Sequence, residues 1–142
     1  MSINLEAIRR QFEEHDQFAS TNGARLVELR QGFARAVMAV EERHWNSLGT
    51  VQGGAIFMLA DFAFGAASNS GGKVAVGINT TMSFMKATRS GTLTAEATEI
   101  SRTRRTSTCT VRVTNESGEL VAFFQGTAYI KDEAFPAAEH QP

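Results

Sequence analysis

Asp61 is the residue whose type and position most clearly suggest chemistry in this sequence. It is the one ionisable residue between Gly53 and Ser70, where nearly all other side chains are apolar or small. Burying an unpaired carboxylate in such surroundings is costly, so something must compensate for its charge. The structural alternative is a position at a wet edge of the domain, or an ion pair with an arginine from elsewhere.

A glycine pair at the start of the same stretch forms a second candidate. The polar segment from His44 to Gln52 leads into Gly53 and Gly54, where a helix is predicted to begin. Backbone N–H groups at a helix N-terminus lack intrahelical acceptors, and the helix dipole adds positive potential, so an oxyanion would fit there. Alternatively, the glycines only permit a tight turn or close packing of the helix.

The spacing of these candidates limits how they can act together. Gly53 and Asp61 are eight positions apart on the predicted helix, which at about 1.5 Å per residue is roughly 12 Å along its axis. One carbonyl group cannot touch both. If both act on the same carbonyl, one of them must come from a second chain, so we predict a homodimer with two equivalent composite sites.

Length and composition predict one compact domain. The chain has 142 residues, 42% of them hydrophobic, and 14 basic against 15 acidic residues give a formal net charge of -1. This balance lacks the cationic excess that drives sequence-independent nucleic-acid binding. Charged residues interrupt both the N-terminus and the longest low-charge stretch, which argues against a signal peptide and a membrane span. With a single cysteine, we expect a soluble cytoplasmic protein.

The periodicity of apolar residues predicts both helices and strands. An amphipathic helix is expected over about residues 4–18, followed by strands over Ala24 to Arg30 and Phe33 to Val40, the second buried on both faces. The long apolar helix covers Gly53 to Ser70. Four further strands are expected over Lys73 to Lys86, Gly91 to Arg102, Thr106 to Thr114 and Glu119 to Lys131.

These elements predict an α+β domain in which a curved antiparallel sheet wraps one long buried helix. Short turns between successive strands favour antiparallel pairing, and a helix that is apolar nearly all round must be buried. We expect a single domain over residues 1–131, with an extra N-terminal helix. Residues 132–142 are expected to form a disordered tail.

The residues around the glycine pair resemble the signature of hotdog-fold acyl-CoA thioesterases of the phenylacetic-acid-pathway (PaaI) type. The residues that carry the resemblance are His44, Asn46, Gly49, Gln52, Gly53 and Gly54, followed by Leu59, Ala60, Asp61 and Asn69. The resemblance extends from about Phe33 to Lys131. It implies a hotdog fold whose protomers pair to give a continuous sheet, with the active site at the dimer interface.

The resemblance also implies catalytic roles. Asp61 would attack the thioester carbonyl or activate a water, the Gly53 N–H would donate to the oxyanion, and Asn46 of the opposite subunit would orient water or the thioester. A preorganised N–H donor is typically worth about 3 kcal/mol. A positioned base is worth about 10²–10⁴-fold in rate.

Further residues are expected by resemblance to contact the substrate, namely Gln52, Gly54, His44, Phe62, Thr81 and Ser83. Gln52 stands where many members have histidine, so it can hydrogen-bond the carbonyl or hold the loop but cannot shuttle a proton near neutral pH. Gly77 stands where Ser or Thr assists in some members, and Thr80, Thr81 or Ser83 could substitute for it. For His44, a structural role in the loop is the favoured alternative.

Cations at strand ends and turns are candidates for binding the CoA phosphates, namely Lys86, Arg89, Arg102, Arg104 and Arg105. Lysine and arginine there could neutralise the nucleotide phosphates. The alternative is that they are solvated charges that protect strand edges. Family sites of this kind often draw such charges from a neighbouring subunit, so a homotetramer is expected beyond the dimer.

No metal ion or redox cofactor is predicted. His15, His44 and His140 are scattered without the spacing of zinc ligands. Cys109 lies in an alternating strand with no histidine near it in sequence, which favours a packing role over a nucleophile.

The predicted function is a hydrolase, an acyl-CoA thioesterase that cleaves an aryl, arylacetyl or short-to-medium acyl-CoA to the free acid and CoA. The alternative is a non-catalytic acyl-CoA-binding hotdog protein, a sensor or partner that uses the same pocket. A hotdog dehydratase or hydratase is disfavoured, because it would pair a carboxylate with a catalytic histidine near the position of Gln52.

Overall fold

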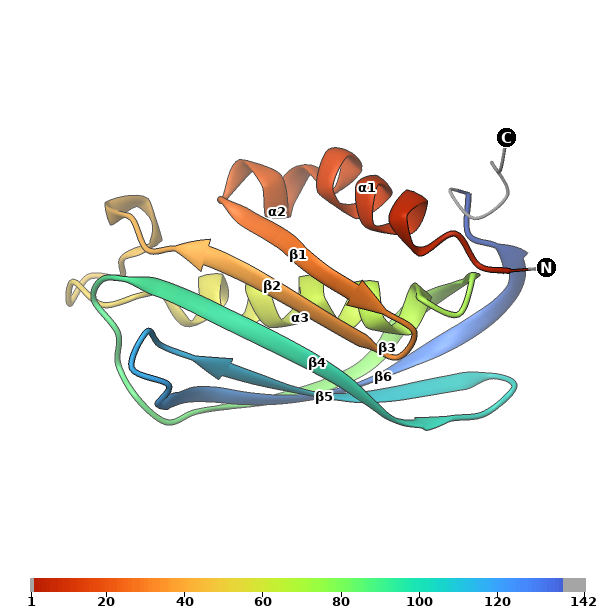
Figure 1. Cartoon of the computed structure of the whole chain (residues 1–142). Helices are drawn as coiled ribbons and strands as arrows, with labels where there is room; N and C mark the ends of the chain where they lie inside the picture. Colours follow the sequence, from red (N-terminus) through yellow and green to blue (C-terminus); the bar gives the residue numbers. More distant parts are fainter. Residues whose placement is uncertain (1, 137–142) are drawn as a thin grey trace.

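The strands and the central helix of the protein follow the order predicted from the sequence (Figure 1). The computed structural model describes residues 2–136. Its elements are α1 (Leu5–His15), α2 (Gln17–Thr21), β1 (Ala24–Arg30), β2 (Phe33–Ala39), the 3-10 turn η1 (Glu42–His44), α3 (Gly53–Asn69), β3 (Lys73–Phe84), β4 (Thr92–Arg102), β5 (Thr106–Thr114) and β6 (Leu120–Ala134). The strands form one six-stranded antiparallel sheet in the order β1-β2-β4-β5-β6-β3. This sheet curves around α3, which confirms the predicted hotdog fold. No helix of residues 2–136 has both the length and the apolar character needed to cross a membrane.

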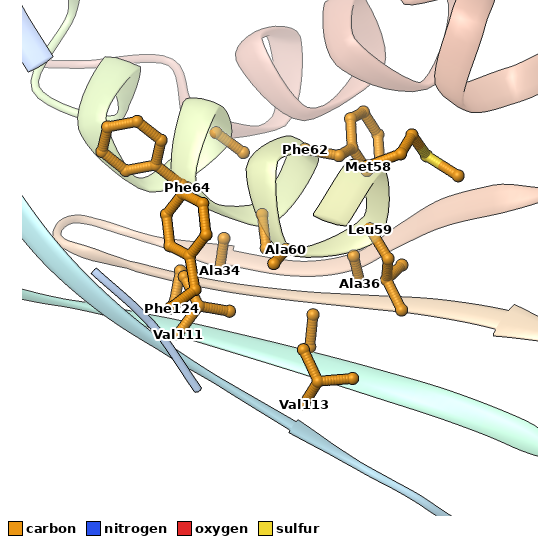
Figure 2. Close-up of a cluster of buried hydrophobic side chains, with 14 of the residues drawn as sticks. Ala34, Ala36, Met58, Leu59, Ala60, Phe62, Phe64, Val111, Val113 and Phe124 are labelled. Carbon is orange, nitrogen blue, oxygen red and sulfur yellow. The ribbon is translucent and has the colours of Figure 1, made fainter. Parts of the chain in front are cut away.

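The central helix α3 packs on the sheet through small side chains. Alanines of β2 and β4 that face the helix lie opposite one another, Ala34 with Ala97 and Ala36 with Ala95, and all four are fully buried. Small side chains on both strands let the alanine-rich helix approach closely. Larger side chains of β5 and β6, among them Phe124, pack along another flank of α3 (Figure 2).

Two glycines make room for the buried ring of Phe64. A Cβ atom at Gly126 of β6 would lie 2.9 Å from Phe64 Cζ, and one at Gly77 of β3 would lie 3.2 Å from Phe64 Cε2. Contacts this short would force the packed ring to move. Gly77 therefore stands where the resemblance led us to expect Ser or Thr because the Phe64 ring packs against that position.

The N-terminal segment forms two helices, whereas the sequence pattern predicted one over residues 4–18. The Asp16 N–H donates to the carbonyl of Phe12 at 3.2 Å and ends α1. The Asp16 carboxylate accepts the Ala19 N–H at 3.0 Å and starts α2. Aspartate is a strong N-cap, so the chain restarts a helix at this residue instead of extending the first one.

Helices α1 and α2, here called the N-terminal arm, run beside α3 in the opposite direction (Figure 1). Ile3, just before the arm, lies beside Gly72 beyond the end of α3, and Phe18 of α2 lines a cavity with Gly54 at the start of α3. Phe12 packs edge-on against Phe62 with ring centroids 6.1 Å apart. The arm thus covers one flank of α3 and leaves the neighbouring flank open.

The second strand and the C-terminus also differ from the prediction. Strand β2 is not buried on both faces, because its residues alternate between buried and half-buried and only one face meets α3. Strand β6 continues to Ala134, and Phe135 stacks on Phe12 with ring centroids 5.5 Å apart. The tail predicted from Asp132 therefore does not begin there, and residues 137–142 lie outside the described residues.

The two edges of the sheet are protected to different degrees. At the β1 edge, the Leu26 N–H donates to Glu13 Oε2 at 2.9 Å and the Leu26 carbonyl accepts from Arg9, both from α1. At the other edge, β3 pairs with β6 on one side and with no other strand of residues 2–136. It exposes Val76 and Ile78, the latter to 61%. An open apolar edge of this kind is a template for pairing with another chain.

Candidate active site

The N-terminus of α3 presents two backbone donors. Gln52 is its N-cap, but the Gln52 side chain caps no N–H group. The N–H groups of Ala55 and Ile56 turn back to the Gln52 carbonyl at 2.9 and 3.3 Å. Those of Gly53 and Gly54 have no acceptor in residues 2–136. Two N–H groups at the positive end of the helix dipole are therefore available to an oxyanion.

Asn46 organises the loop that leads into α3. Its Oδ1 accepts the N–H groups of Leu48 at 2.9 Å and Thr50 at 3.2 Å, and its Nδ2 donates to Thr50 Oγ1 at 2.9 Å. These bonds hold the loop in a tight turn directly before the glycine pair. One amide hydrogen of Asn46 is left over, and it is the group with which Asn46 could orient water or a thioester.

His44 has both ring nitrogens engaged and is buried. Its Nδ1 accepts the Glu41 N–H at 3.0 Å, and its Nε2 donates to the carbonyl of Asn22 at 2.7 Å, which places the ring proton on Nε2. The His44 carbonyl also accepts the Gln52 N–H at 2.7 Å. These contacts fit the loop-bracing role favoured from the sequence and leave neither ring nitrogen free to hydrogen-bond a substrate.

Asp61 lies in the middle of α3 on the flank that neither the sheet nor the N-terminal arm covers. Contrary to the expectation of burial, its side chain is exposed in the single chain, and it makes no hydrogen bond or ion pair with the described residues. The surrounding protein still removes water from one side of the carboxylate, and this desolvation, followed by the charge of Asp16, raises the pKa of Asp61. In the single chain, Asp61 therefore has the solvent-exposed position that was one structural alternative, and no arginine among the described residues pairs with it.

Two cavities flank the start of α3. The strand-side cavity, of about 310 Å³, is lined by Val51, Gly53, Ile56, Phe84, Met85, Lys86 and Ala87. The arm-side cavity, of about 190 Å³, is lined by Phe18, Asn22, Arg43, His44, Gln52, Gly54, Ala55 and Met58. Since Gly53 lines the first and Gly54 the second, the two free N–H donors lie between the cavities.

Thr81 and Ser83 do not face these cavities. In β6, Phe124 and Gly126 point toward α3, whereas Gln125 between them is exposed on the other face. Directly opposed residues of antiparallel strands share a face, and Thr81 lies opposite Gln125. Ser83 lies two residues further along the same face. Thr81 and Ser83 therefore do not reach these cavities within the single chain, and their predicted substrate contacts stay a prediction.

Thr80 lies on the other face of β3 from Thr81 and Ser83, although it also lines neither of the two cavities. It lies opposite Gly126, on the face of the sheet that meets α3. The strand register shifts between Gly77 and Asn79, so strict alternation along the sequence does not identify this face.

Phe62 also differs from its predicted role as a substrate contact. It is buried on the side of α3 that faces the N-terminal arm, where its ring packs against Phe12 (Figure 2). It lines neither cavity at the start of α3. Phe62 is thus a core contact that attaches the arm.

Two of the predicted phosphate-binding cations lie near the start of α3. Lys86 lines the strand-side cavity and forms an ion pair with Glu119, and the hydrogen bond from Lys86 lowers the pKa of that carboxyl. Arg89 lies beside Gly49, and its carbonyl accepts the indole N–H of Trp45 at 3.0 Å. Both side chains are exposed enough to meet a charged ligand.

The other three cations lie at the opposite end of α3. Arg102 donates to the Ser68 carbonyl at 2.9 Å and supports the C-terminus of the helix, Arg105 pairs with Asp132 at 3.0 Å, and Arg104 is exposed in the same turn. The 17 residues of α3 span about 25 Å. The five candidate cations therefore do not meet at one place within the single chain, and their contact with the CoA phosphates stays a prediction.

Cys109 is fully buried in β5, and burial raises the pKa of its thiol to about 11. The thiol stays protonated near neutral pH, in agreement with the packing role predicted for it. Within residues 2–136, no group of three or more His, Cys, Asp or Glu side chains is placed to hold a metal ion.

The sequence pattern missed the contribution of the N-terminal arm to the site. Phe18 of α2 lines the arm-side cavity together with Asn22, which follows the arm, and Arg43 of η1. The charge of Asp16, between the two helices of the arm, helps to raise the pKa of Asp61. The one available signal was an aromatic residue, Phe18, at the end of the predicted helix. Nothing local indicated that this helix would lie beside α3.

Comparison with known proteins identifies several close matches. Residues 48–122 match the family described as the thioesterase superfamily. The chain is 32% identical to the acyl-coenzyme A thioesterase PaaI of Escherichia coli strain K12 over 117 residues, which are 82% of this chain and 84% of that protein. The solved structure of the E. coli PaaI protein from the phenylacetic acid degradation operon is similar with a TM-score of 0.88 and 29% identity, covering 94% of this chain and 99% of that chain.

Two further solved structures are similar to the chain. A mutant of the phenylacetic acid degradation protein PaaI from Thermus thermophilus has a TM-score of 0.77 and 36% identity, covering 80% of this chain and 98% of that chain. The protein smu.793 of Streptococcus mutans UA159, solved bound to acetyl CoA, has a TM-score of 0.74 and 26% identity, covering 78% of this chain and 90% of that chain.

Proposed function

The chain belongs to the thioesterase superfamily, and from this we propose that it hydrolyses the thioester bond of an acyl-CoA to give a free acid and CoA. One observation carries the proposal. The N–H groups of Gly53 and Gly54 lack acceptors in the described chain at the N-terminus of a helix that carries an unpaired carboxylate, Asp61, two turns further on. These are the parts that acyl transfer needs, an oxyanion donor and a base or nucleophile.

We propose that two chains complete the site. Gly53 and Asp61 of one chain are separated by about 12 Å along α3, so the Gly53 N–H of one protomer acts with Asp61 of the partner subunit. The open apolar edge of β3 supports a dimer in which two such edges pair into a continuous sheet. The uncovered flank of α3 then faces its counterpart. A homotetramer, in which cations of a further subunit reach the CoA phosphates, stays a prediction.

In the proposed reaction the thioester carbonyl oxygen accepts the Gly53 N–H. The Asp61 carboxylate of the partner subunit either attacks the carbonyl carbon or removes a proton from an attacking water. Both routes pass through a tetrahedral oxyanion that expels the CoA thiolate, which then takes up a proton. On the nucleophilic route, water hydrolyses the resulting acyl anhydride and restores the carboxylate. The raised pKa of Asp61 makes the carboxylate a stronger base than an ordinary aspartate. The proposed chemistry uses no metal ion or redox cofactor.

Release of the CoA thiol, followed with a thiol-reactive chromophore, tests the activity. Acetyl-, hexanoyl-, decanoyl-, benzoyl- and phenylacetyl-CoA form a panel that also identifies the acyl class. Hydrolysis of at least one member is the expected result. If none is cleaved while calorimetry shows that the same thioesters bind, the non-catalytic acyl-CoA-binding alternative replaces the proposal.

Mixed dimers test whether the site is shared between chains. Neither a Gly53→Pro chain nor an Asp61→Asn chain should form an active homodimer. A one-to-one mixture, unfolded and refolded together, contains heterodimers with one site that combines an intact Gly53 with an intact Asp61. The mixture should recover about a quarter of the wild-type activity by random pairing. No recovery, with heterodimers present, would show that both residues act within one chain.

A further inference from the structure

We propose that the arm-side cavity holds the acyl group of the substrate and that Phe18 of the N-terminal arm determines which acyl groups fit. Phe18 and Met58 of α3 both line this cavity. The inference rests on the proposed thioesterase function and adds to it the location of the acyl group and the residue that limits its size. Phe18 carries a large ring that is 69% exposed beside this cavity.

The polar groups around the arm-side cavity are almost all engaged with the protein. Asn22 Nδ2 donates to the carbonyl of Phe18 at 2.9 Å, and both ring nitrogens of His44 are bonded to the loop. The Arg43 guanidinium donates to a backbone carbonyl of α2 and pairs with an acidic side chain. Only the Gln52 side chain, among the polar side chains of this cavity, makes no hydrogen bond to the described residues. The cavity therefore suits an apolar group with one polar atom near Gln52.

A thioester has this distribution of polarity, since its carbonyl joins an apolar acyl group. With the carbonyl oxygen at the Gly53 N–H and beside Gln52, the acyl group extends past Gly54 into the arm-side cavity, toward Phe18 and Met58. An apolar ligand would bind weakly if it buried polar groups that have no hydrogen-bond partner. Few such groups line this cavity.

The position of the cavity on α3 relates it to the reacting groups. Gly54, Met58 and Asp61 are separated by four and then three residues, so they lie on one face of the helix. This is the flank that a partner subunit would cover, which brings that partner's carboxylate close to the mouth of the cavity. The strand-side cavity opens on a different face, beside Gly53 and Ile56, and its cation Lys86 suits the CoA side of the substrate better than an acyl chain.

The size of the cavity favours compact acyl groups. Its volume of about 190 Å³ is comparable with the roughly 150 Å³ of an engineered apolar protein cavity that admits benzene. A ring or a short chain fits such a space, and a long chain would have to displace Phe18. The arm itself is anchored elsewhere, through Phe12 against Phe62 and Phe135, so a change at Phe18 should leave the arm in place.

Substitutions that enlarge or fill the cavity test the proposal. We would measure kcat and KM for acetyl-, benzoyl-, phenylacetyl- and decanoyl-CoA with wild type, Phe18→Ala and Phe18→Trp. Phe18→Trp should lower kcat/KM for the bulky acyl groups relative to acetyl-CoA by about ten-fold or more. Phe18→Ala should raise the relative kcat/KM for decanoyl-CoA by a similar factor. The ratio between substrates does not depend on how much of each variant is folded.

Two further variants make the result specific. Ile100→Ala removes an equally apolar exposed side chain (58% exposed) of β4 that lines neither cavity, and it should keep the wild-type ratios. Phe84→Ala opens the strand-side cavity instead. Unchanged ratios in both Phe18 variants, or a selectivity change with Phe84→Ala alone, would overturn the proposal while the thioesterase function stands. If wild type cleaves no thioester, the proposed function itself fails.

Discussion

Replacing Gly53 with proline removes the proposed oxyanion donor while disturbing the backbone little. Gly53 is the first residue of α3, where proline is well tolerated because that N–H has no helical acceptor. Gln52 before it has φ -59° and ψ 136°, the extended conformation that a residue preceding proline prefers. A Cβ atom at Gly53 would lie 3.2 Å from Phe84 Cζ. Phe84 is an exposed side chain near the end of an edge strand, so its ring can move aside.

The expected loss can be estimated from the one donor that is removed. Loss of an oxyanion donor typically lowers kcat by about 10²–10³-fold, or about 2.7–4 kcal/mol in activation free energy. Gly53→Ala is the matched control, because it places the same Cβ against Phe84 but keeps the N–H. We expect the alanine variant to retain activity within a few-fold of wild type. Thiol release from the best thioester of the panel measures kcat, and thermal unfolding confirms that both variants fold.

Two results would refute this reasoning. If folded Gly53→Pro is as active as Gly53→Ala, the Gly53 N–H is not the oxyanion donor. If both variants lose activity equally, the Phe84 contact and not the N–H accounts for the loss.

Three further predictions concern the carboxylates and the sheet edge. Asp61→Asn should lower kcat by about 10²–10⁴-fold without lowering Tm at neutral pH. The raised pKa of Asp61 in the wild type means that the folded chain binds this proton more tightly than the unfolded chain. At neutral pH the charged carboxylate therefore destabilises the fold, and removing it should not lower Tm. A lower Tm with retained turnover would contradict this prediction. Asp16→Asn keeps the N-cap of α2 but removes a charge that raises the pKa of Asp61. The fall of kcat/KM on the acidic side of its pH profile should therefore move to lower pH. An unchanged pH profile would show that Asp16 does not affect the pKa of Asp61. Ile78→Lys on the open edge of β3 should give inactive monomers by light scattering, whereas Ile100→Lys should stay dimeric; a dimeric, active Ile78→Lys would exclude pairing through this edge.

Much of the fold was predictable because it depends on local patterns. The apolar run from Gly53 onward identified α3 to within one residue, and turn residues separated the strands. The free N–H groups at the glycine pair follow from their place at a helix start, a local property as well. The single helix predicted for residues 4–18 failed for a local reason too, because the capping strength of Asp16 outweighed the continuing apolar period.

The faces of the elements depend on contacts that the sequence does not display. A register shift between Gly77 and Asn79 changes which residues of β3 face the helix, so Thr80 replaces Thr81. A carboxylate among apolar residues was expected to be buried, yet Asp61 is exposed because the sheet and the N-terminal arm leave one flank of α3 open.

The sequence by itself determined the order of the elements, the position of α3, and the spacing of Gly53 and Asp61 along it, since helical periodicity and chain distance are local quantities. Only the tertiary structure decided that Phe18 lines the site, that His44 is engaged in its loop, and that the predicted cations lie at both ends of α3. These features arise where segments far apart in sequence pack together, and that packing is fixed by the shape and volume of the whole core.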